Sequence, residues 1–414
     1  GVDDTFTATV DYGDGMPIEN APVNEETRTL ALSHTYAATG SFLATVTITD
    51  DDGASRVRNF WVVAQPGPAP TFAPGDTVDA GTQPVDLAVG QLGGSSLPDI
   101  VVADQAANAV LVLVQSAPGV LKPAVAHSVG AQPIAVVVGD VDGDGRHDIV
   151  ATNQADDTLS LILQTSPGSL QPAVHLPTGQ GPSAAAIGDV TGDGRPDLVS
   201  ADTDSATVSV MEQTSDGSFL ERWIRPVGVA PSAIAIADLD GLDGLDVVVA
   251  NAGSDNINLL FNASDGQWQS FKSSSVGNTP VAIAVADIDG DGRLDILTAN
   301  EASNTVSYLR QSSTPGLFVS AVSLPAPGAP RSLSVGDVDG NGLPDLVAAA
   351  SADNQVIVMR QSASSATGFE LVALDGAAGD GIWAAALVDL NGDGTDDIVT
   401  ANTTSGGVTV FLQD

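Results

Sequence analysis

The sequence predicts an all-β protein in which a seven-bladed β-propeller follows a small, truncated immunoglobulin-like β-sandwich. Three observations support this prediction. A nine-residue acidic segment recurs along the chain, short apolar stretches with strand-like alternation flank each copy, and the 414 residues include 44 glycines and 24 prolines, which favour tight turns. A helical solenoid is disfavoured, because no window shows apolar residues at the helical spacing.

The acidic segment defines the repeat. Six copies are closely related, as in residues 140–148 (DVDGDGRHD), whereas residues 91–99 (QLGGSSLPD) form a degenerate seventh copy. Successive copies are 49 to 52 residues apart. The copies begin at residues 91, 140, 189, 238, 287, 337 and 389. This period is typical of propeller blades, which contain four antiparallel strands each.

Each repeat contains four predicted strands. In the repeat around residue 287, alternating apolar residues predict a first strand over 280–286, before the acidic loop. Two more strands are expected over 295–300 and 305–309, with a turn near Asn304 between them. The fourth strand is expected over 318–324.

The two ends of the repeat region are complementary. The last repeat stops after its third strand, residues 408–412, and so lacks a fourth. Residues 72–84 resemble residues 121–133 of the next repeat, which contain a fourth strand, but no strands of a blade precede them. We therefore expect residues 72–80 to pair with the last strand and close the ring, which removes exposed sheet edges.

The repeat boundaries divide the chain into three segments. We expect a partial β-sandwich over residues 1–65, a semi-stiff linker rich in proline and glycine over residues 66–71, and the propeller over residues 72–414. The chain begins at Gly1 within a strand-like pattern, so it is expected to be part of a longer protein.

The acidic segments have the residue pattern of calcium-binding loops. Positions 1, 3, 5 and 9 carry Asp or Asn in most copies, and glycines at positions 4 and 6 permit a tightly curled backbone. Carboxylates this close together repel each other unless a cation lies among them. Oxygen ligands without His or Cys favour Ca²⁺, with Mg²⁺ as the weaker competitor. The alternative is that Asp and Gly simply populate turns, which the recurrence of the pattern disfavours.

About five calcium ions are expected, bound through these side chains and through the backbone carbonyl at position 7. The predicted ligands are Asp140, Asp142, Asp144, Arg146, Asp148, Asp189, Thr191, Asp193, Arg195, Asp197, Asp287, Asp289, Asp291, Arg293, Asp295, Asp337, Asp339, Asn341, Leu343, Asp345, Asp389, Asn391, Asp393, Thr395 and Asp397. A doubtful set, in a loop with Leu242 at position 5, is Asp238, Asp240, Asp243 and Asp246. The loop at residue 91 is expected to bind no ion.

The composition excludes some partners. A formal net charge of −39, from 52 acidic and 13 basic residues, argues against nucleic acid, whose phosphates require a basic surface. No apolar run is long enough to span a membrane, no signal peptide is recognisable, and no cysteine is present. Calcium loops of extracellular modules bind at about 10⁻⁴ to 10⁻³ M, so an extracellular or cell-surface location is expected.

The loops resemble known repeats. The pattern D-x-D-G-D-G-x-x-D, followed by an apolar strand and Ala-Asn as in residues 287–300, resembles the FG-GAP or VCBS repeats of bacterial surface proteins and of the integrin α-subunit head. The resemblance covers residues 72–414 and implies structural calcium loops between the first two strands of each blade. Residues 11–15 (DYGDG), 34–36 (HTY) and 40–53 resemble a PKD domain, an immunoglobulin-like sandwich whose usual preceding strands are missing here.

These features favour a calcium-stabilised extracellular binding or adhesion module, part of a larger bacterial surface or secreted protein, that engages a glycan or a protein and is not an enzyme. Trp383, at the start of an inner strand, is the candidate ligand contact. A polysaccharide lyase or hydrolase and a purely structural spacer are the alternatives. Against an enzyme, His127 and His175 occupy adjacent rather than equivalent positions of two fourth strands, so they are expected to face opposite sides.

Overall fold

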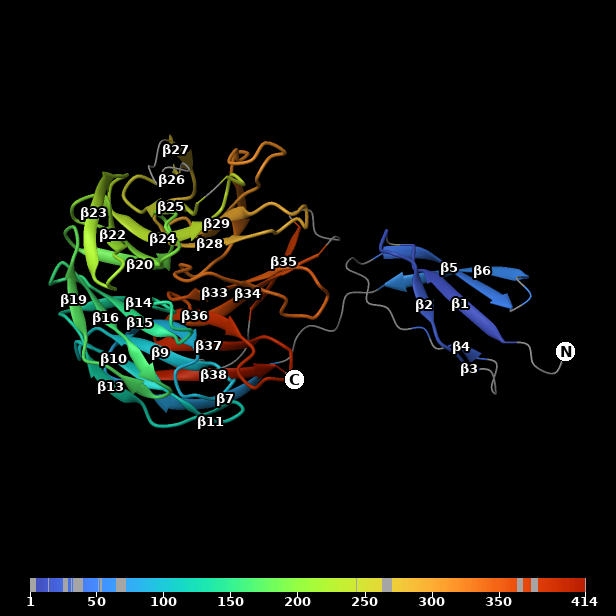
Figure 1. Cartoon of the computed structure of the whole chain (residues 1–414), viewed down its shortest axis with the longest axis horizontal. Coiled ribbons are helices and arrows are strands. Elements are labelled where there is room, and N and C mark those ends of the chain that lie inside the picture. The colour runs from blue at the N-terminus through green and yellow to red at the C-terminus, as the bar shows by residue number, and fades with distance from the viewer. Residues whose placement is uncertain are drawn as a thin grey trace. The chain divides into compact units, whose positions relative to one another are not determined.

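The computed structural model describes residues 5–13, 15–24, 29–30, 32, 40–50, 52, 54–64, 72–242, 244–262, 270–362, 368–373 and 379–413. These residues form strands, turns and bends without a helix, as expected (Figure 1). None of them therefore contributes a helix long and apolar enough to cross a membrane. The chain divides into two compact units. The smaller comprises residues 1–69, 339–343 and 361–370, and the larger comprises residues 70–338, 344–360 and 371–414.

In the smaller unit, the described residues of the N-terminal segment form one four-stranded sheet and a short hairpin. The sheet has the order β2 (Glu19–Ala21), β1 (Phe6–Asp11), β5 (Gly40–Asp50) and β6 (Ser55–Ala64), and the hairpin joins β3 (Val23–Asn24) to β4 (Thr29–Leu30). Val10, Tyr12 and Val46 form its small core. The PKD-like residues 34–36, together with Asp14, Asp51 and Gly53, lie outside the described residues.

Residues 72–413 contain seven four-stranded antiparallel sheets among those that the structure describes. In chain order, their strands are β8 (Pro84–Gly90), β9 (Asp99–Asp104), β10 (Ala109–Leu113) and β13 (Val125–Ser128); β14 (Pro133–Gly139), β15 (Asp148–Asn153), β16 (Thr158–Ile162) and β19 (Val174–Pro177); β20 (Pro182–Gly188), β21 (Asp197–Asp202), β22 (Thr207–Gln213) and β23 (Phe219–Pro226); β24 (Pro231–Ala237), β25 (Asp246–Asn251), β26 (Asn256–Phe261) and β27 (Ser270–Ser275); β28 (Pro280–Ala286), β29 (Asp295–Asn300), β30 (Thr305–Leu309) and β31 (Val322–Pro325); β32 (Ser334–Gly336), β33 (Asp345–Ala350), β34 (Gln355–Gln361) and β35 (Phe369–Ala373); β36 (Ile382–Val388), β37 (Asp397–Asn402), β38 (Gly407–Gln413) and β7 (Phe72–Asp79). Two further hairpins pair β11 (Gln115–Ala117) with β12 (Val120–Leu121), and β17 (Gln164–Ser166) with β18 (Ser169–Leu170).

The sheets pack face to face in sequence. Every residue of the second strands β9, β15, β21, β25, β29, β33 and β37 is buried, which explains their nearly continuous apolar sequences. Val101 of the first sheet and Ile149 of the second share one apolar cluster. Ile100 of the first sheet and Val399 of the seventh share another, so the first sheet also packs against the last.

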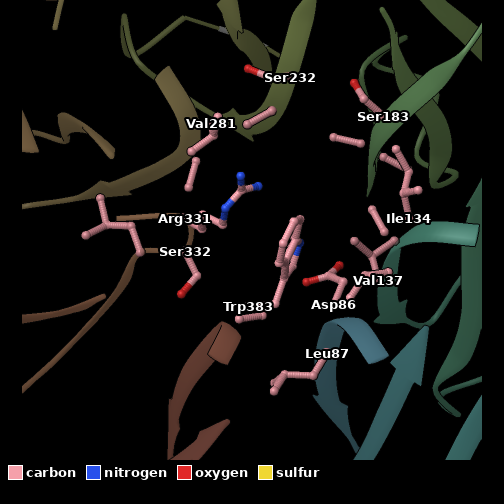
Figure 2. A pocket seen from close by; sticks show the side chains of 18 of the residues that line it. Asp86, Leu87, Ile134, Val137, Ser183, Ser232, Val281, Arg331, Ser332 and Trp383 are labelled. Atoms are coloured by element: carbon pink, nitrogen blue, oxygen red, sulfur yellow. The ribbon is translucent and has the colours of Figure 1, made fainter. Parts of the chain in front are cut away.

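The inner strands lie around a common centre. Each of β8, β14, β20, β24, β28, β32 and β36 contacts the next, and β36 contacts β8. Figure 1 shows several of these strands facing one another, and together they enclose a cavity of about 610 Å³, seen from close by in Figure 2. We refer to it as the central cavity.

The predicted pairing between the ends of the repeat region is present. Strand β7 lies antiparallel to β38, with Phe72 opposite Gln413 and Val78 opposite Val408. The seventh sheet therefore takes three strands from the end of the chain and its outer strand from residues 72–79.

Hairpins between second and third strands connect several of the sheets to the next one. Asn304 adopts a positive φ of 54°, which Asn tolerates better than most residues. Its side chain accepts a hydrogen bond from the backbone N–H of Ala329, at 2.8 Å, on the chain that leads into the next sheet. Asp157 and Asp255 make the same contact with Gly181 and Thr279. The turn predicted near Asn304 therefore also joins two sheets.

Candidate functional site

Each acidic loop connects an inner strand to the second strand of the same sheet. In the loop at residues 140–148, Asp140 at position 1 organises the backbone. Its Oδ1 accepts hydrogen bonds from the N–H groups of Gly143 and Asp144, at 2.8 and 3.1 Å, and its Oδ2 accepts one from Gly145 at 2.9 Å. Gly143 and Gly145 have φ values of 76° and 83°, so positions 4 and 6 adopt the left-handed conformation that glycine permits.

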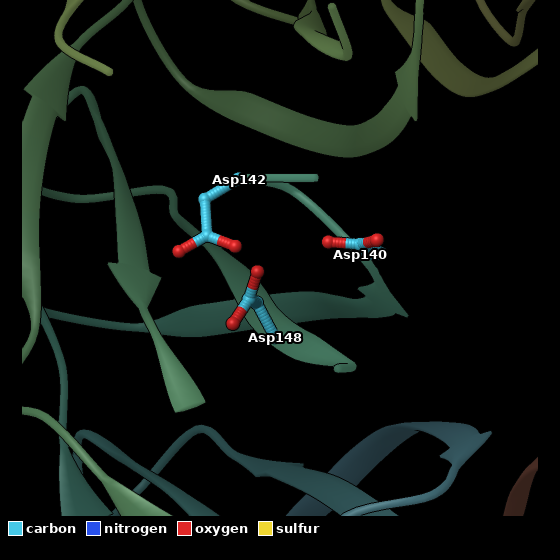
Figure 3. Close-up of side chains that lie close together, drawn as sticks. All are labelled: Asp140, Asp142 and Asp148. Atoms are coloured by element: carbon cyan, nitrogen blue, oxygen red, sulfur yellow. The ribbon is translucent and has the colours of Figure 1, made fainter. Parts of the chain in front are cut away.

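The loops bring carboxylates together. In the first full loop, Asp140, Asp142 and Asp148 each place one oxygen within 4.8 Å of the others (Figure 3). Three such acidic groups could hold a metal ion elsewhere in the described residues. They are Asp287, Asp289 and Asp291; Asp337, Asp339 and Asp345; and Asp238, Asp240 and Asp246. The donor set is all oxygen and anionic, which fits Ca²⁺.

The remaining predicted ligands are less closely grouped. Within the described residues, the loops beginning at Asp189 and Asp389 do not contain three carboxylates that meet the same distance, since Thr191 and Asn391 replace the acid at position 3. Their position-1 aspartates nevertheless accept the same backbone hydrogen bonds as Asp140. The doubtful loop at residue 238 does group its acids, although Asp243 lies outside the described residues.

The position-5 aspartates turn toward the neighbouring arginines. Asp144, Asp193 and Asp291 form ion pairs with Arg146, Arg195 and Arg293, respectively. The guanidinium of Arg146 also donates from Nε to the carbonyl of Gln164, at 2.9 Å. From the sequence, only the backbone carbonyl of position 7 was predicted to act, as a metal ligand. The ion pairs between the arginine side chains at position 7 and the aspartates at position 5 were not predicted.

The position-9 aspartates have a structural role in addition to their predicted metal ligation. Asp148 is fully buried, and its two carboxylate oxygens accept hydrogen bonds from the N–H groups of Val141 and Gln164, at 2.9 and 2.7 Å. In the degenerate loop, Asp99 makes the equivalent bonds with Leu92 and Gln115. The same buried aspartate therefore holds a loop that lacks the other carboxylates.

Burial shifts the titration of these aspartates. It raises the pKa of Asp148, and it raises that of Asp197 and Asp246 to about 6, against the lowering effect of their backbone hydrogen bonds. A cation bound beside them would favour the ionised form.

In several loops, a backbone carbonyl accepts a hydrogen bond from a glutamine or asparagine side chain of the next sheet. The Nε2 of Gln164 donates to the carbonyl of Leu92, and Gln213, Asn262 and Gln311 repeat this contact 72 residues apart with Val141, Val190 and Leu239. Gln115 of the first sheet makes it with Leu390 in the loop of the seventh sheet. We call these contacts the inter-sheet amide hydrogen bonds. Each joins position 2 of an acidic loop to the end of a third strand.

One acid near the loops was missed in the sequence. Asp396 occupies position 8 of the last loop, where other loops have His, Pro or Leu. Burial raises its pKa, and the charges of Asp389, Asp337 and Asp397 raise it further, so it faces the loop of the preceding sheet as well as its own. The signal was present as a single acid at a position where no other copy has one.

The candidate ligand contact Trp383 lies in the central cavity. It follows Ile382, the first residue of β36, and the aligned residue of every other repeat, which follows a proline, also lines the cavity. These residues are Val85, Ile134, Ser183, Ser232, Val281, Arg331 and Trp383. The Arg331 guanidinium lies over the Trp383 ring, 3.8 Å from its centroid. The sequence placed Trp383 correctly at the inner strands but did not indicate its partner.

The two histidines of the enzyme alternative line one cavity. His127 pairs with Val110 and His175 with Ser160, so they occupy adjacent strand positions as predicted. The cavity that both line has a volume of about 510 Å³. Opposite faces of two successive sheets point toward each other, so side chains on opposite faces of their own sheets can line the same cavity. The other lining residues include neither a carboxylate nor a lysine.

Comparisons with known proteins agree with this architecture. The family model for FG-GAP-like repeats matches residues 92–151, 140–200, 189–241, 243–298, 287–348 and 338–400. Together these six matches cover more than half of the chain. No curated protein sequence matches the chain.

Several solved structures have a similar fold. One is BBS1N in complex with ARL6DN, with 14% identity, a TM-score of 0.57, and coverage of 82% of this chain and 97% of the other. A functionally unknown protein from Desulfotomaculum acetoxidans has 13% identity, a TM-score of 0.50, and coverage of 86% and 96%. A protein from Lactobacillus plantarum has 14% identity, a TM-score of 0.50, and coverage of 99% and 100%. At these identities the likeness concerns the fold alone.

Proposed function

The chain belongs to the FG-GAP-like repeat family, and we propose that it is a calcium-stabilised, seven-bladed β-propeller that serves as an extracellular binding or adhesion module. The observation that carries the proposal is the recurrence of grouped aspartates in equivalent loops. In a chain with a net charge of −39, such groups are unfavourable without cations. Calcium supplies the charge and accepts six to eight oxygen ligands.

The sheets support the proposed blade count and closure. We interpret the seven four-stranded sheets as blades, and the β7–β38 pairing and the Gln115 to Leu390 bond support a closed ring. The N-terminal sheet, together with the residues 11–15 motif, is proposed to be a truncated PKD-like sandwich. Millimolar calcium outside cells would occupy the loops, which supports an extracellular or cell-surface location.

The proposed ligand of the module is a glycan or a protein. Rigid, closed propellers present loops and channel mouths that recognition can use, and Trp383 is an exposed aromatic side chain in such a place. The neighbour BBS1N was crystallised in complex with ARL6DN, so a propeller of this general fold can engage a partner. A structural spacer without a ligand is the main alternative.

Calcium titration tests the metal part of the proposal. Calorimetry should detect about five sites, and thermal unfolding should show a large loss of stability in chelator, since each site filled at about 100 times its dissociation constant contributes about 2.7 kcal/mol. Magnesium at the same concentration should stabilise much less. A melting temperature that is equal in calcium and in chelator would contradict the proposal.

A glycan array probed in calcium and in chelator tests the ligand part. Calcium-dependent capture of specific glycans would support a binding module. Turnover of an acidic polysaccharide in a parallel panel would instead establish the enzyme alternative. Absence of both binding and turnover, with calcium binding intact, would favour the spacer.

A further inference from the structure

The central cavity is asymmetric in a way that the repeat does not require. At the position that aligns with Trp383 in the seven repeats, five sheets have Val, Ile or Ser, whereas the last two have Arg331 and Trp383. The two serines are engaged in packing the sheets: the hydroxyl of Ser183 donates to the carbonyl of Pro231 at 2.8 Å, and that of Ser232 donates to Pro280 at 2.6 Å. The hydroxyls of these two serines are therefore already engaged within the chain.

The positive charge of the cavity is neutralised within the chain. Arg331 forms an ion pair with Glu301 and donates from Nε to the hydroxyl of Ser351 at 3.2 Å. Its guanidinium also stacks on Trp383. Because these contacts occupy the arginine, the cavity is not a ready site for an anion.

Asp86 is the uncompensated charge in the cavity. In five of the other six inner strands, alanine occupies the equivalent position, so packing does not require an acid there. The carboxylate accepts a hydrogen bond from the N–H of Val136, at 2.8 Å, and no basic side chain of the described residues forms an ion pair with it. Burial among apolar residues raises its pKa to about 7.

Figure 2 shows Asp86 on one side of the Trp383 indole and Arg331 on the other. We propose that the central cavity binds a small organic cation, whose ammonium group is neutralised by Asp86 and covered by the indole of Trp383. A carboxylate beside an aromatic ring is the arrangement that recognises ammonium groups. The volume of about 610 Å³ is that of a small-molecule site, and the acidic chain attracts cations toward it. This site is separate from the calcium loops and does not depend on the proposed adhesion role.

Calorimetric titration with choline, in constant saturating calcium, tests this inference. The matched probe is its uncharged carbon isostere, in which a tert-butyl group replaces the trimethylammonium group. We expect choline to bind and the isostere to bind at least tenfold more weakly. Asp86→Asn keeps an oxygen that can accept the Val136 bond, so the variant should fold with an unchanged far-UV spectrum and lose at least tenfold in choline affinity. Trp383→Leu should weaken choline binding to a similar extent.

Glu221→Gln is the matched control, because it removes one exposed acid from the outer strand β23, away from the cavity. Its choline affinity should equal that of the unaltered protein. The inference is overturned if choline does not bind, if the isostere binds equally well, or if Asp86→Asn binds choline as tightly as the unaltered protein. Binding of neutral pyranoses to the cavity in place of choline would also overturn it and would assign the cavity to a glycan. Calcium titration of the same variants separates these outcomes from a failure of the calcium proposal.

Discussion

At the scale of single residues, aspartates in one loop have different partners and therefore different expected roles. Asp142 at position 3 is exposed, and its carboxylate accepts a hydrogen bond from the N–H of Asp144 at 3.2 Å. Asp148 at position 9 is buried and connects the loop to the end of the third strand. We therefore expect Asp142 to contribute to the proposed calcium site alone, whereas Asp148 also stabilises the fold.

Two substitutions should separate these roles. Asp142→Asn removes one ligand charge and should weaken calcium binding at that loop about tenfold, while the melting temperature in chelator stays unchanged. Asp148→Asn replaces one of two buried acceptor oxygens with a donor group. It should therefore lower the melting temperature in chelator as well, and we expect a loss of about 1–3 kcal/mol in unfolding free energy. Calorimetry and thermal unfolding measure the two effects.

Asp99→Asn supplies the control for this pair, since the degenerate loop makes the same two bonds without the other carboxylates. It should destabilise the protein as Asp148→Asn does and leave the number of calcium ions unchanged. Equal stability of Asp148→Asn and the unaltered protein in chelator would contradict the structural role.

Asp86 gives a prediction about pH. Its pKa is raised from 3.8 to about 7 in the folded protein, so the folded state holds the proton more tightly than the unfolded chain does. The stability contributed by this proton is present at low pH and is lost as pH rises through about 7. Asp86→Asn should therefore raise the melting temperature relative to the unaltered protein at about pH 8, and the difference should shrink as the pH falls toward 5. Taking the difference between the two proteins removes the common titration of the loop aspartates. A difference that does not depend on pH would contradict the assignment.

The loop ligands could be predicted from the sequence because they are close together in the chain. Asp86 and Asp396 could not, because their importance depends on residues of another sheet: Asp86 on Trp383, and Asp396 on Asp337. The pairing of Asp144 with Arg146 was also not predicted, although the two residues are only two positions apart, because the loop pattern indicates a cation as the partner of Asp144.

At the scale of elements, the strands with a clear apolar pattern in the repeat around residue 287 were predicted within about one residue, whereas its outer strand was not. The predicted strands 280–286, 295–300 and 305–309 are β28, β29 and β30. The fourth was expected over 318–324, but β31 spans Val322–Pro325, and Phe318 forms only an isolated bridge with Gln311. Outer strands are half exposed, so their sequence is weakly constrained by packing.

The inter-sheet amide hydrogen bonds connect the acidic loop of one sheet to the residues at the end of the third strand of the next sheet. Gln213 donates from Nε2 to the carbonyl of Val141 at 2.7 Å, and both groups are buried. Gln213→Met keeps the length of the side chain but leaves that carbonyl without its donor, which should cost about 1–3 kcal/mol in unfolding free energy. Thermal unfolding in saturating calcium measures the loss.

The matched control is Gln171→Met, at an exposed glutamine whose side chain donates only to Thr165. It should leave the melting temperature unchanged within about 1 °C. Similar melting temperatures for Gln213→Met and Gln171→Met would show that the hydrogen bond from Gln213 to Val141 contributes nothing to stability.

At the scale of the whole molecule, the proposed closed ring depends on contacts between the two ends of the repeat region. Ala80 and Val78 pack in the same apolar cluster as Val408 and Val410, and strand β7 covers the edge of β38. The complementary ends of the sequence were enough to predict this pairing, because a missing fourth strand and an unaccompanied one can both be counted. The packing of the first sheet on the seventh required the structure.

Closure can be tested by comparing two truncated chains, one beginning at residue 72 and the other at residue 81. The longer chain retains β7, whereas the shorter chain leaves β38 as an exposed edge with unpaired backbone groups and uncovers Val408 and Val410. We expect the shorter chain to melt roughly 10 °C lower and to self-associate through its free edge, as measured by thermal unfolding and by light scattering after size exclusion. The chain beginning at residue 72 is the control, because both proteins lack the N-terminal segment. A monomeric shorter chain with the same melting temperature would mean that the β7–β38 pairing is dispensable, and the ring would then be held only by the packing of its sheets.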